Sequence, residues 1–258
     1  MFVHKIDPVL FELGPLEVRY YGLTYVIGFL LILFFVRWWI TKRPIQNLGK
    51  DDVTDLMLYM MIGGIVGARA FHVFVYNFGY YMSNPAHMIM FWKGGMAFHG
   101  GLLGAILVAY FYIKRRKISF YETADVVVVP LAFALAIGRI ANFINAELVG
   151  TVTSLPWCVV FPGYDGCRHP VQIYEMFKNI FIGSVLFYLL WRGRIFGRKL
   201  ARGTIFWSFV LLYGILRFLA QFYRAYEIQL GLFDVPQYFS IAMILAAVFM
   251  IYWLNRFN

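Results

Sequence analysis

The sequence predicts an all-α membrane protein with several transmembrane helices. Hydrophobic residues make up 62% of its 258 positions and charged residues only 14%, whereas soluble domains have about 45–50% and about 25%. So few charges cannot cover the surface of a soluble domain. The apolar runs also lack the alternation of apolar and polar residues that marks a transmembrane β-barrel. We therefore expect one integral membrane domain, residues 1–258.

Seven apolar runs are long enough, at 1.5 Å per residue, for a helix to cross a hydrocarbon core of about 30 Å. They cover residues 20–40, 56–76, 95–113, 124–145, 171–191, 203–224 and 238–254. Acidic residues precede the first run, so this run is expected to remain as an uncleaved anchor. The halves of the sequence show no internal repeat, which would be typical of a transporter.

Basic residues cluster in alternate loops and predict the orientation of the helices. The loops after the first, third and fifth runs hold Lys42, Arg43 and Lys50, then Lys114, Arg115, Arg116 and Lys117, then Arg192, Arg194, Arg198, Lys199 and Arg202. The other loops carry few, among them Lys93 and Arg168. By the positive-inside rule the N-terminus lies outside and the C-terminus in the cytoplasm.

The net charge of +10 would suggest nucleic-acid binding in a soluble protein. Here the same charge is explained by cytoplasmic loops that lie against anionic membrane lipids. No nucleic-acid partner is expected.

The longest polar interruption, residues 146–170, is rich in proline and glycine and is expected to form a small head outside the membrane, between the fourth and fifth helices. It contains both cysteines, Cys158 and Cys167. An oxidising compartment would permit a disulfide, and two free thiols are equally compatible with the sequence.

Charged side chains inside apolar runs cost about 2.5–3.5 kcal/mol each, so each one present needs a reason. Among those within or at the ends of the runs are Arg69, Arg139, Glu147, Glu175, Lys178 and Arg217. For Lys178, an ion pair or extension of the side chain to the membrane surface is the favoured explanation. For Arg139 and Arg217, the neighbouring polar residues indicate a functional site.

The end of the fourth run has the pattern of an anion site. On a helix, Arg139, Asn142 and Asn145 would lie on one side, with Glu147 just beyond. A guanidinium donates two parallel hydrogen bonds to phosphate oxygens, and the amides add neutral donors.

The sixth run repeats the pattern with Tyr213, Arg217 and Gln221, followed by Arg224. Two buried arginines from different helices suggest one shared anion. The alternative is two unrelated structural arginines.

The third run opens with a glycine-rich segment, residues 94–101, that contains His99. Such glycines allow another helix or a lipid headgroup to approach the backbone. His99 is either a satisfied hydrogen-bonding partner or a general base, since its ordinary pKa is near neutral. The sequence has no motif for a metal, a nucleotide or a serine hydrolase, so no metal or cofactor is expected.

These motifs together resemble the bacterial prolipoprotein diacylglyceryl transferases. The similarity is strongest in residues 138–150, where the family's arginine, two asparagines, glutamate and glycine are all matched. Further matching segments are residues 20–23, 67–69, 76–77, 94–101, 168–175 and 213–217. The similarity extends over nearly the whole chain.

The resemblance implies a seven-helix enzyme of the bacterial plasma (inner) membrane. It would transfer the diacylglyceryl group of phosphatidylglycerol to the lipobox cysteine in the signal peptide of a prolipoprotein, and release glycerol phosphate. Its partners would be these two substrates and the surrounding membrane lipids, with no cofactor.

The resemblance also implies roles for particular residues. Arg139 would bind the headgroup, Arg217 would stabilise the departing glycerol phosphate, and His99 would generate the thiolate. The remaining substrate-binding residues implied are Tyr21, Arg69, Asn142, Asn145, Glu147 and Tyr213.

Two positions depart from the family pattern. Gln221 replaces a usual glutamate, so an ion pair from this position to Arg217 or Arg224 is expected to be missing, and residues 235–237 also differ. A divergent relative with another substrate is therefore an alternative. The rival class is a membrane protein that binds or transports an anionic lipid without chemistry, and an acyltransferase is a further alternative.

Overall fold

The computed structural model describes residues 2–13, 16–90, 94–195, 198–225 and 229–256. Lys93, used above for the orientation of the helices, lies outside these residues. The chain divides into two compact units. One comprises Met1–Phe35 and Tyr121–Asn258, and the other comprises Val36–Phe120. We describe each by itself.

Helices form most of the described chain. The long ones are α1 (Tyr20–Lys42), α2 (Lys50–Phe71), α4 (Phe98–Arg116), α5 (Phe120–Ile144), α6 (Val171–Arg192), α7 (Thr204–Gln221) and α8 (Val235–Arg256). The short ones are the π-helix η1 (His72–Tyr76), α3 (Phe78–Ser83) and the 3-10 helix η2 (Pro85–Ile89). Each predicted run thus corresponds to one long helix, although the ends differ by several residues.

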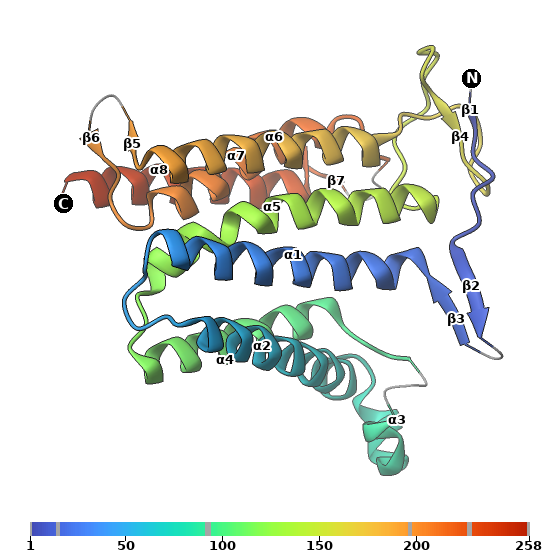
Figure 1. Ribbon diagram of the computed structural model, residues 1–258. Helices are drawn as coiled ribbons and strands as arrows, with labels where there is room; N and C mark the ends of the chain where they lie inside the picture. The colour runs from blue at the N-terminus through green and yellow to red at the C-terminus, as the bar shows by residue number, and fades with distance from the viewer. Residues whose placement is uncertain (1, 14–15, 91–93, 196–197, 226–228, 257–258) are drawn as a thin grey trace. The chain divides into compact units, whose positions relative to one another are not determined.

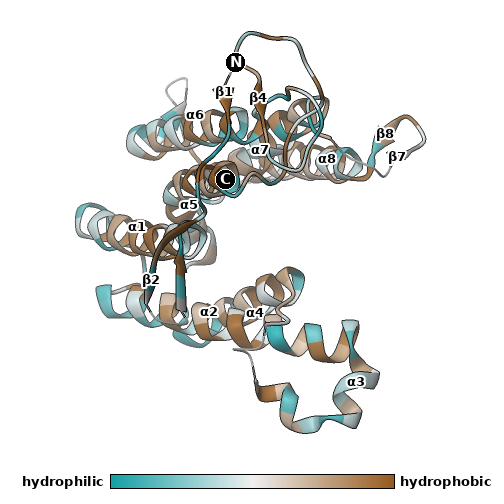
Figure 2. Cartoon of the chain, turned by 90° about the vertical axis from the view of Figure 1, so that its right-hand side faces the viewer, coloured by the Kyte–Doolittle hydropathy of each residue, from teal (hydrophilic) through white to brown (hydrophobic). Residues whose placement is uncertain are grey.

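Six helices among the described residues are long and apolar enough to cross a membrane. They are α1, α2 continued through η1, α5, α6, α7 and α8. The third predicted run forms α4, which is not among the six. Its first turn contains His99 and two glycines, and its last turn contains three basic residues, so its apolar stretch is short. Figure 2 shows the predominantly apolar colouring of the helices.

The predicted all-α class is confirmed in that the protein is predominantly helical, and the described residues also include four two-stranded sheets. They pair β1 (Phe2–Val3) with β4 (Val159–Val160), β2 (Val9–Leu13) with β3 (Leu16–Arg19), β5 (Arg194–Ile195) with β6 (Arg198–Lys199), and β7 (Gln229–Leu230) with β8 (Phe233–Asp234). All but the first pair are antiparallel hairpins. These strands are too short or too close to the helices to show a hydrophobic period of their own.

The unit Val36–Phe120 is built on close packing of α2 against α4, which run side by side in Figure 1. Glycines at positions 63 and 67 of α2 face glycines at positions 100 and 104 of α4. A Cβ atom on Gly100 would collide with Phe71 and the carbonyl of Gly67, and one on Gly104 would collide with the carbonyl of Gly63. The glycine-rich segment therefore serves the approach of a helix, one of its two predicted uses.

The other unit contains α5, α6, α7 and α8, with α7 packed against both α6 and α8 (Figure 1). Its core includes Val129 of α5, Ile182 and Leu186 of α6 and Ala247 of α8, each at most 1% exposed. Asp125 links two helices: its carboxylate accepts hydrogen bonds of 2.7 Å from the backbone N–H groups of Gly203 and Phe206, where α7 begins. An acidic side chain from α5 thus caps α7.

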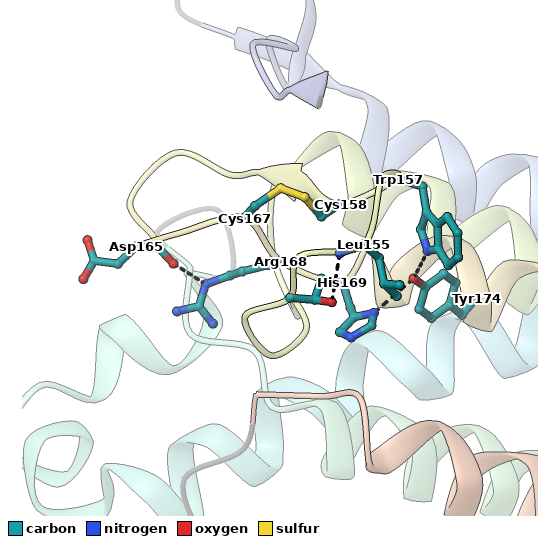
Figure 3. Close-up of a disulfide and its surroundings, with 9 residues drawn as sticks. Leu155, Trp157, Cys158, Asp165, Cys167, Arg168, His169 and Tyr174 are labelled. Carbon is teal, nitrogen blue, oxygen red and sulfur yellow. Dashed lines mark hydrogen bonds between the residues drawn. A yellow bond between two sulfur atoms is a disulfide. The ribbon is translucent and has the colours of Figure 1, made fainter.

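Residues 146–170 fold into a small compact segment, here called the head. A disulfide joins Cys158 to Cys167, whose Cα atoms are 5.5 Å apart (Figure 3), which decides the question that the sequence left open. The N-terminal strand β1 lies beside the head strand β4, and the ring of His4 contacts the carbonyl of Phe143 at 2.8 Å.

Candidate functional site

The candidate site is centred on Glu175, a side chain of α6 that is completely buried. It belongs to a polar stripe with Gln172, Lys178 and Asn179, which recur every three or four residues and are all buried. Helical spacing turns these side chains to the same side of α6. A carboxylate in such a place is stable only if cations and hydrogen-bond donors surround it.

Four cations surround Glu175. Its Oε2 atom lies 2.7 Å from Arg139 Nη2 and 3.9 Å from Lys178 Nζ. Its Oε1 atom lies 3.1 Å from Arg217 Nη1 and 3.4 Å from Arg224 Nη1. One carboxylate therefore faces four positive charges, and the site retains an excess of positive charge away from bulk water. We call these five residues the Glu175 cluster.

The two arginines predicted to share one anion both pair with the carboxylate of Glu175. Binding of a ligand anion by this pair stays a prediction. Both Arg217 and Arg224 have an acidic partner in Glu175, although position 221 carries no glutamate. Gln221 instead donates a hydrogen bond of 2.8 Å to Asp234.

A second carboxylate is connected to the cluster through an amide. Arg139 Nη1 donates to Asn142 Oδ1 at 3.1 Å, and Asn142 Nδ2 donates to Glu147 Oε1 at 2.6 Å. The backbone is strained on both sides of Glu147. Ala146 and Leu148 adopt positive φ angles of 53° and 57°, which are rare for residues other than glycine.

Asn145 occupies a different position from the one predicted. Helix α5 ends at Ile144, so Asn145 lies in the following turn and not on the helix face that carries Arg139. Its Oδ1 atom is buried and has no hydrogen-bonding partner among the described residues. A buried amide oxygen without a partner is costly, so this atom is suited to accept a hydrogen bond from a ligand.

Backbone groups of the head contact the helices that carry this site. Gln172 Nε2 donates to the Glu147 carbonyl at 2.6 Å, and Gly150 pairs with both His169 and the segment after α7. A side chain on Gly150 would collide with His169 and with the carbonyl of Tyr223. These contacts join the end of α5, the start of α6 and the end of α7 at one place.

Aromatic residues and His169 form a wall where the head meets α6. Trp157 Nε1 donates to Tyr174 Oη at 2.7 Å, and the same hydroxyl lies 3.2 Å from His169 Nδ1 (Figure 3). Burial lowers the pKa of His169 below its ordinary value. Burial thus favours the neutral imidazole, which shares a hydrogen bond between Nδ1 and the Tyr174 hydroxyl.

Trp157 and Tyr174 of this wall line two cavities. One, of about 550 Å³, is apolar and is lined by Phe2, Phe143, Trp157, Val159, Pro170, Ile173, Tyr174 and Phe177. The other, of about 470 Å³, lies between the head, α6 and α7 and is lined by Leu155, Trp157, His169, Tyr174, Lys178, Leu216, Leu219, Ala220 and Tyr223.

Of the remaining predicted residues, Tyr213 contacts the cluster through Lys178, and Tyr21 lies in α1. The hydroxyl groups of Tyr21 and Tyr25 in α1 are 3.0 Å apart at an exposed position. The ring of Tyr213 lies under Lys178 Nζ, 4.2 Å from its centre.

Arg69 and His99 belong to the unit Val36–Phe120. Arg69 is buried and donates hydrogen bonds to the carbonyls of His87, Met88, Met90, Gly94 and Gly95. This pattern favours a structural role, that of holding the chain between η2 and α4. His99 is exposed at the start of α4, with its ring against Phe98. Their assignment to the substrate site stays a prediction.

The site residues that sequence reasoning missed are Glu175 as its centre and Arg224 as a member. The signal was present, because Glu175 is an acidic residue inside an apolar run, among runs that otherwise hold mostly cations. No group of three or more His, Cys, Asp or Glu side chains in the described part of the chain could hold a metal ion.

A multi-helix membrane protein with a buried, electropositive cluster near one end of its helices is the class that fold and site define. The family model named prolipoprotein diacylglyceryl transferase matches residues 8–253. The phosphatidylglycerol–prolipoprotein diacylglyceryl transferase of Geobacter sulfurreducens is 42% identical over 257 residues, which cover 97% of this chain and 96% of that protein.

Two further relatives carry the same name. The protein of Aliivibrio fischeri is 41% identical and covers 98% of this chain and 91% of its own length. That of Vibrio cholerae is 38% identical, with 96% and 92% covered. The chain belongs to the prolipoprotein diacylglyceryl transferase family.

Proposed function

We propose that this protein transfers the diacylglyceryl group of phosphatidylglycerol to the thiol of a prolipoprotein cysteine, the first step of bacterial lipoprotein maturation. The observation that carries the proposal is the Glu175 cluster, in which three arginines and a lysine surround one carboxylate. Its excess positive charge suits a phosphate that gains charge as it leaves. Membership of the family supports the same reaction.

The reaction balances without a cofactor. The cysteine thiol loses its proton, the thiolate sulfur attacks the glyceryl carbon that carries the phosphate, and the carbon–oxygen bond breaks. The electron pair of this bond goes to the phosphate oxygen, which leaves as glycerol phosphate. The protein must therefore supply a place for a phosphate and an acceptor for one proton.

Arg139 and Arg217 fit the phosphate role because both present guanidinium groups in a water-poor site, 19% and 16% exposed. Glu175 holds them apart from one another in fixed positions before the lipid arrives. Such preorganised donors need no rearrangement as charge develops in the transition state. Arg139 would bind the headgroup and Arg217 the leaving phosphate.

The polar groups beside Arg139 fit the glycerol headgroup. Asn145 Oδ1 is free to accept a hydroxyl hydrogen bond, and Glu147 can accept another while Asn142 keeps it in place. Tyr21, Tyr213 and Arg69 would also bind the substrate, as the resemblance to the family implies. His99 would accept the thiol proton.

The proposed setting is the bacterial inner membrane, with seven crossings, the N-terminus and the head outside, and the C-terminus in the cytoplasm. The pairing of β1 with β4 supports an even number of crossings between residues 3 and 159. Helices α1, α2 and α5 supply three of these, so α4 is the natural fourth. The second substrate is the lipobox segment of a signal peptide.

The test is transfer by purified protein from phosphatidylglycerol to a lipobox peptide, followed by peptide mass and by released glycerol phosphate. We expect a mass gain on cysteine for the wild type and a loss of about 100-fold or more for Arg139→Ala. Arg202→Ala is the matched control, because Arg202 is 68% exposed and pairs with Glu122. No mass gain with folded wild-type protein would overturn the proposal.

A further inference from the structure

Lys178 is the cation of the Glu175 cluster whose charge is least compensated. Its side chain is 6% exposed, yet its Nζ atom has no hydrogen-bond acceptor among the described residues; its contacts are Glu175 at 3.9 Å and the ring of Tyr213, whose centre is 4.2 Å away. The same carboxylate is already bound more closely by three arginines. A buried ammonium with so little compensation is costly unless a ligand supplies negative charge.

The place from which a ligand can reach Lys178 is the cavity of about 470 Å³ between the head, α6 and α7. Lys178 and His169 are its only lining residues with a basic side chain, and burial lowers the pKa of His169 below its ordinary value. The α7 wall is apolar, with Leu216, Leu219 and Ala220. A cavity with one ammonium and apolar walls suits an amphiphile with an anionic headgroup.

Lys178 and Arg139 approach the same oxygen, Glu175 Oε2, at 3.9 and 2.7 Å. A phosphate bound to the arginines would therefore place the far end of its headgroup within reach of the field of Lys178. This matters because a phosphodiester looks the same to the arginines whether its headgroup is glycerol or carries an ammonium. The arginines alone can bind both kinds of lipid.

We propose that Lys178 is a specificity-determining residue that excludes phospholipids with a positively charged headgroup. It attracts a lipid whose only charge is the phosphate, and it repels a distal ammonium of a zwitterionic lipid. Specificity arises here from an unfavourable charge contact with the wrong ligand, as well as from attraction to the right one. This inference rests on the proposed function, because it concerns the choice of its lipid donor.

Glu147 is the group that could oppose this effect, since its carboxylate would attract an ammonium. It is joined to Asn142 at 2.6 Å and does not line the cavity. Glu175 also carries a negative charge, but its two oxygens are shared among four cations. The ammonium would thus meet a net positive field near Lys178.

The test compares phosphatidylglycerol with phosphatidylethanolamine of identical acyl chains in detergent micelles. Transfer from phosphatidylglycerol to a lipobox peptide gives KM, and phosphatidylethanolamine as competitor gives Ki. For Lys178→Met, which removes the charge and keeps the length, we expect Ki/KM to fall about tenfold, with kcat changed less than KM. Lys178→Arg should keep the wild-type ratio. Leu219→Met, in the same wall, should keep it as well.

A second measurement separates this inference from the proposed function. The two lipids retained by purified protein from an equimolar mixture are counted by native mass spectrometry, which needs no transfer. If the wild type transfers normally and Lys178→Met keeps the wild-type preference in both assays, the role of Lys178 is refuted and the transferase stands. If the wild type prefers phosphatidylglycerol through Lys178 but transfers nothing, only the proposed reaction fails. Lys178→Gln decides in the same way should the methionine variant not fold.

Discussion

At the scale of single residues, the electrostatic centre of this protein is one buried carboxylate. Removing Glu175 would leave three arginines and a lysine to repel each other in a water-poor site. Breaking such a buried network costs about 3–5 kcal/mol. Glu175→Gln is therefore expected to lower the thermal stability of the protein and to abolish transfer, because the arginines lose their fixed positions.

The same variant has a second, less obvious consequence. Since its arginines are unpaired, added phosphatidylglycerol should raise its melting temperature by more than that of the wild type. Glu122→Gln is the control, because Glu122 pairs with the exposed Arg202 outside the cluster. Equal stability and equal activity of Glu175→Gln and wild type would contradict the central role assigned to the carboxylate.

His169 gives the protein a pH dependence of known sign. Burial lowers its pKa in the folded state, so the unfolded chain, whose histidine has the ordinary value of about 6.5, takes up the proton first as the pH falls. The stability contribution is therefore fully present above about pH 6.5 and is lost as the pH falls towards the folded-state pKa. Melting temperatures should decrease between pH 7.5 and 5.5, and His169→Gln should make the decrease smaller. An unchanged slope in the variant would remove His169 as the cause.

Much of the site could be predicted at this scale, and the limit was physical. Arg139 and Arg217 stand out because a charge in an apolar run is costly. The same cost indicates that each needs an anionic partner. Glu175 was visible by the same criterion, but its distance in sequence from both arginines hides the contact. Only the rotation of α6 relative to α5 and α7 brings the three side chains together, and a hydrophobic pattern does not specify that rotation.

At the scale of elements, the packing of α2 on α4 depends on the absence of side chains. A Cβ atom on Gly104 would collide with the carbonyl of Gly63 and with Gly67. Because both contacts are backbone atoms, neither can move without separating the helices. Gly104→Ala is expected to destabilise the protein by about 1–3 kcal/mol, the usual range for overpacking.

Thermal unfolding in detergent measures this effect. Gly79→Ala is the matched control in the same unit, since a Cβ atom there has no neighbour within 4 Å. It should leave the stability unchanged or raise it slightly, because alanine is the better helix former. A loss of stability as large as that of Gly104→Ala would show that helix contact is not the reason.

The elements also show which parts of the fold were open to prediction. Long apolar runs identified all seven long helices, because a run of that length has few alternatives in a membrane protein. The cap that Asp125 provides for α7 joins residues about 80 positions apart, and no local pattern signals it. The end of α5 was also missed, and this moved Asn145 from the helix face into a turn.

At the scale of the whole molecule, one short sheet constrains the membrane topology that we propose. Strand β1 pairs with β4, so we infer that the N-terminus and the head lie on the same side of the membrane. Between them the chain passes through α1, α2, α4 and α5. An even number of these must cross, and three of the four are long and apolar enough by themselves. The seven crossings that we propose would therefore require α4 to span the membrane despite its polar ends.

Labelling of single cysteines tests this parity directly. The native cysteines are joined in a disulfide, so they leave no free thiol as background. We expect Lys5→Cys and Ser154→Cys to react with a membrane-impermeant maleimide in intact spheroplasts, and Lys199→Cys to react only after permeabilisation. Lys199 is one helix, α6, away from the head, and all three positions are exposed. Opposite accessibility of positions 5 and 154 would mean that α4 does not cross, and protection of both would reverse the orientation that the basic loops predict.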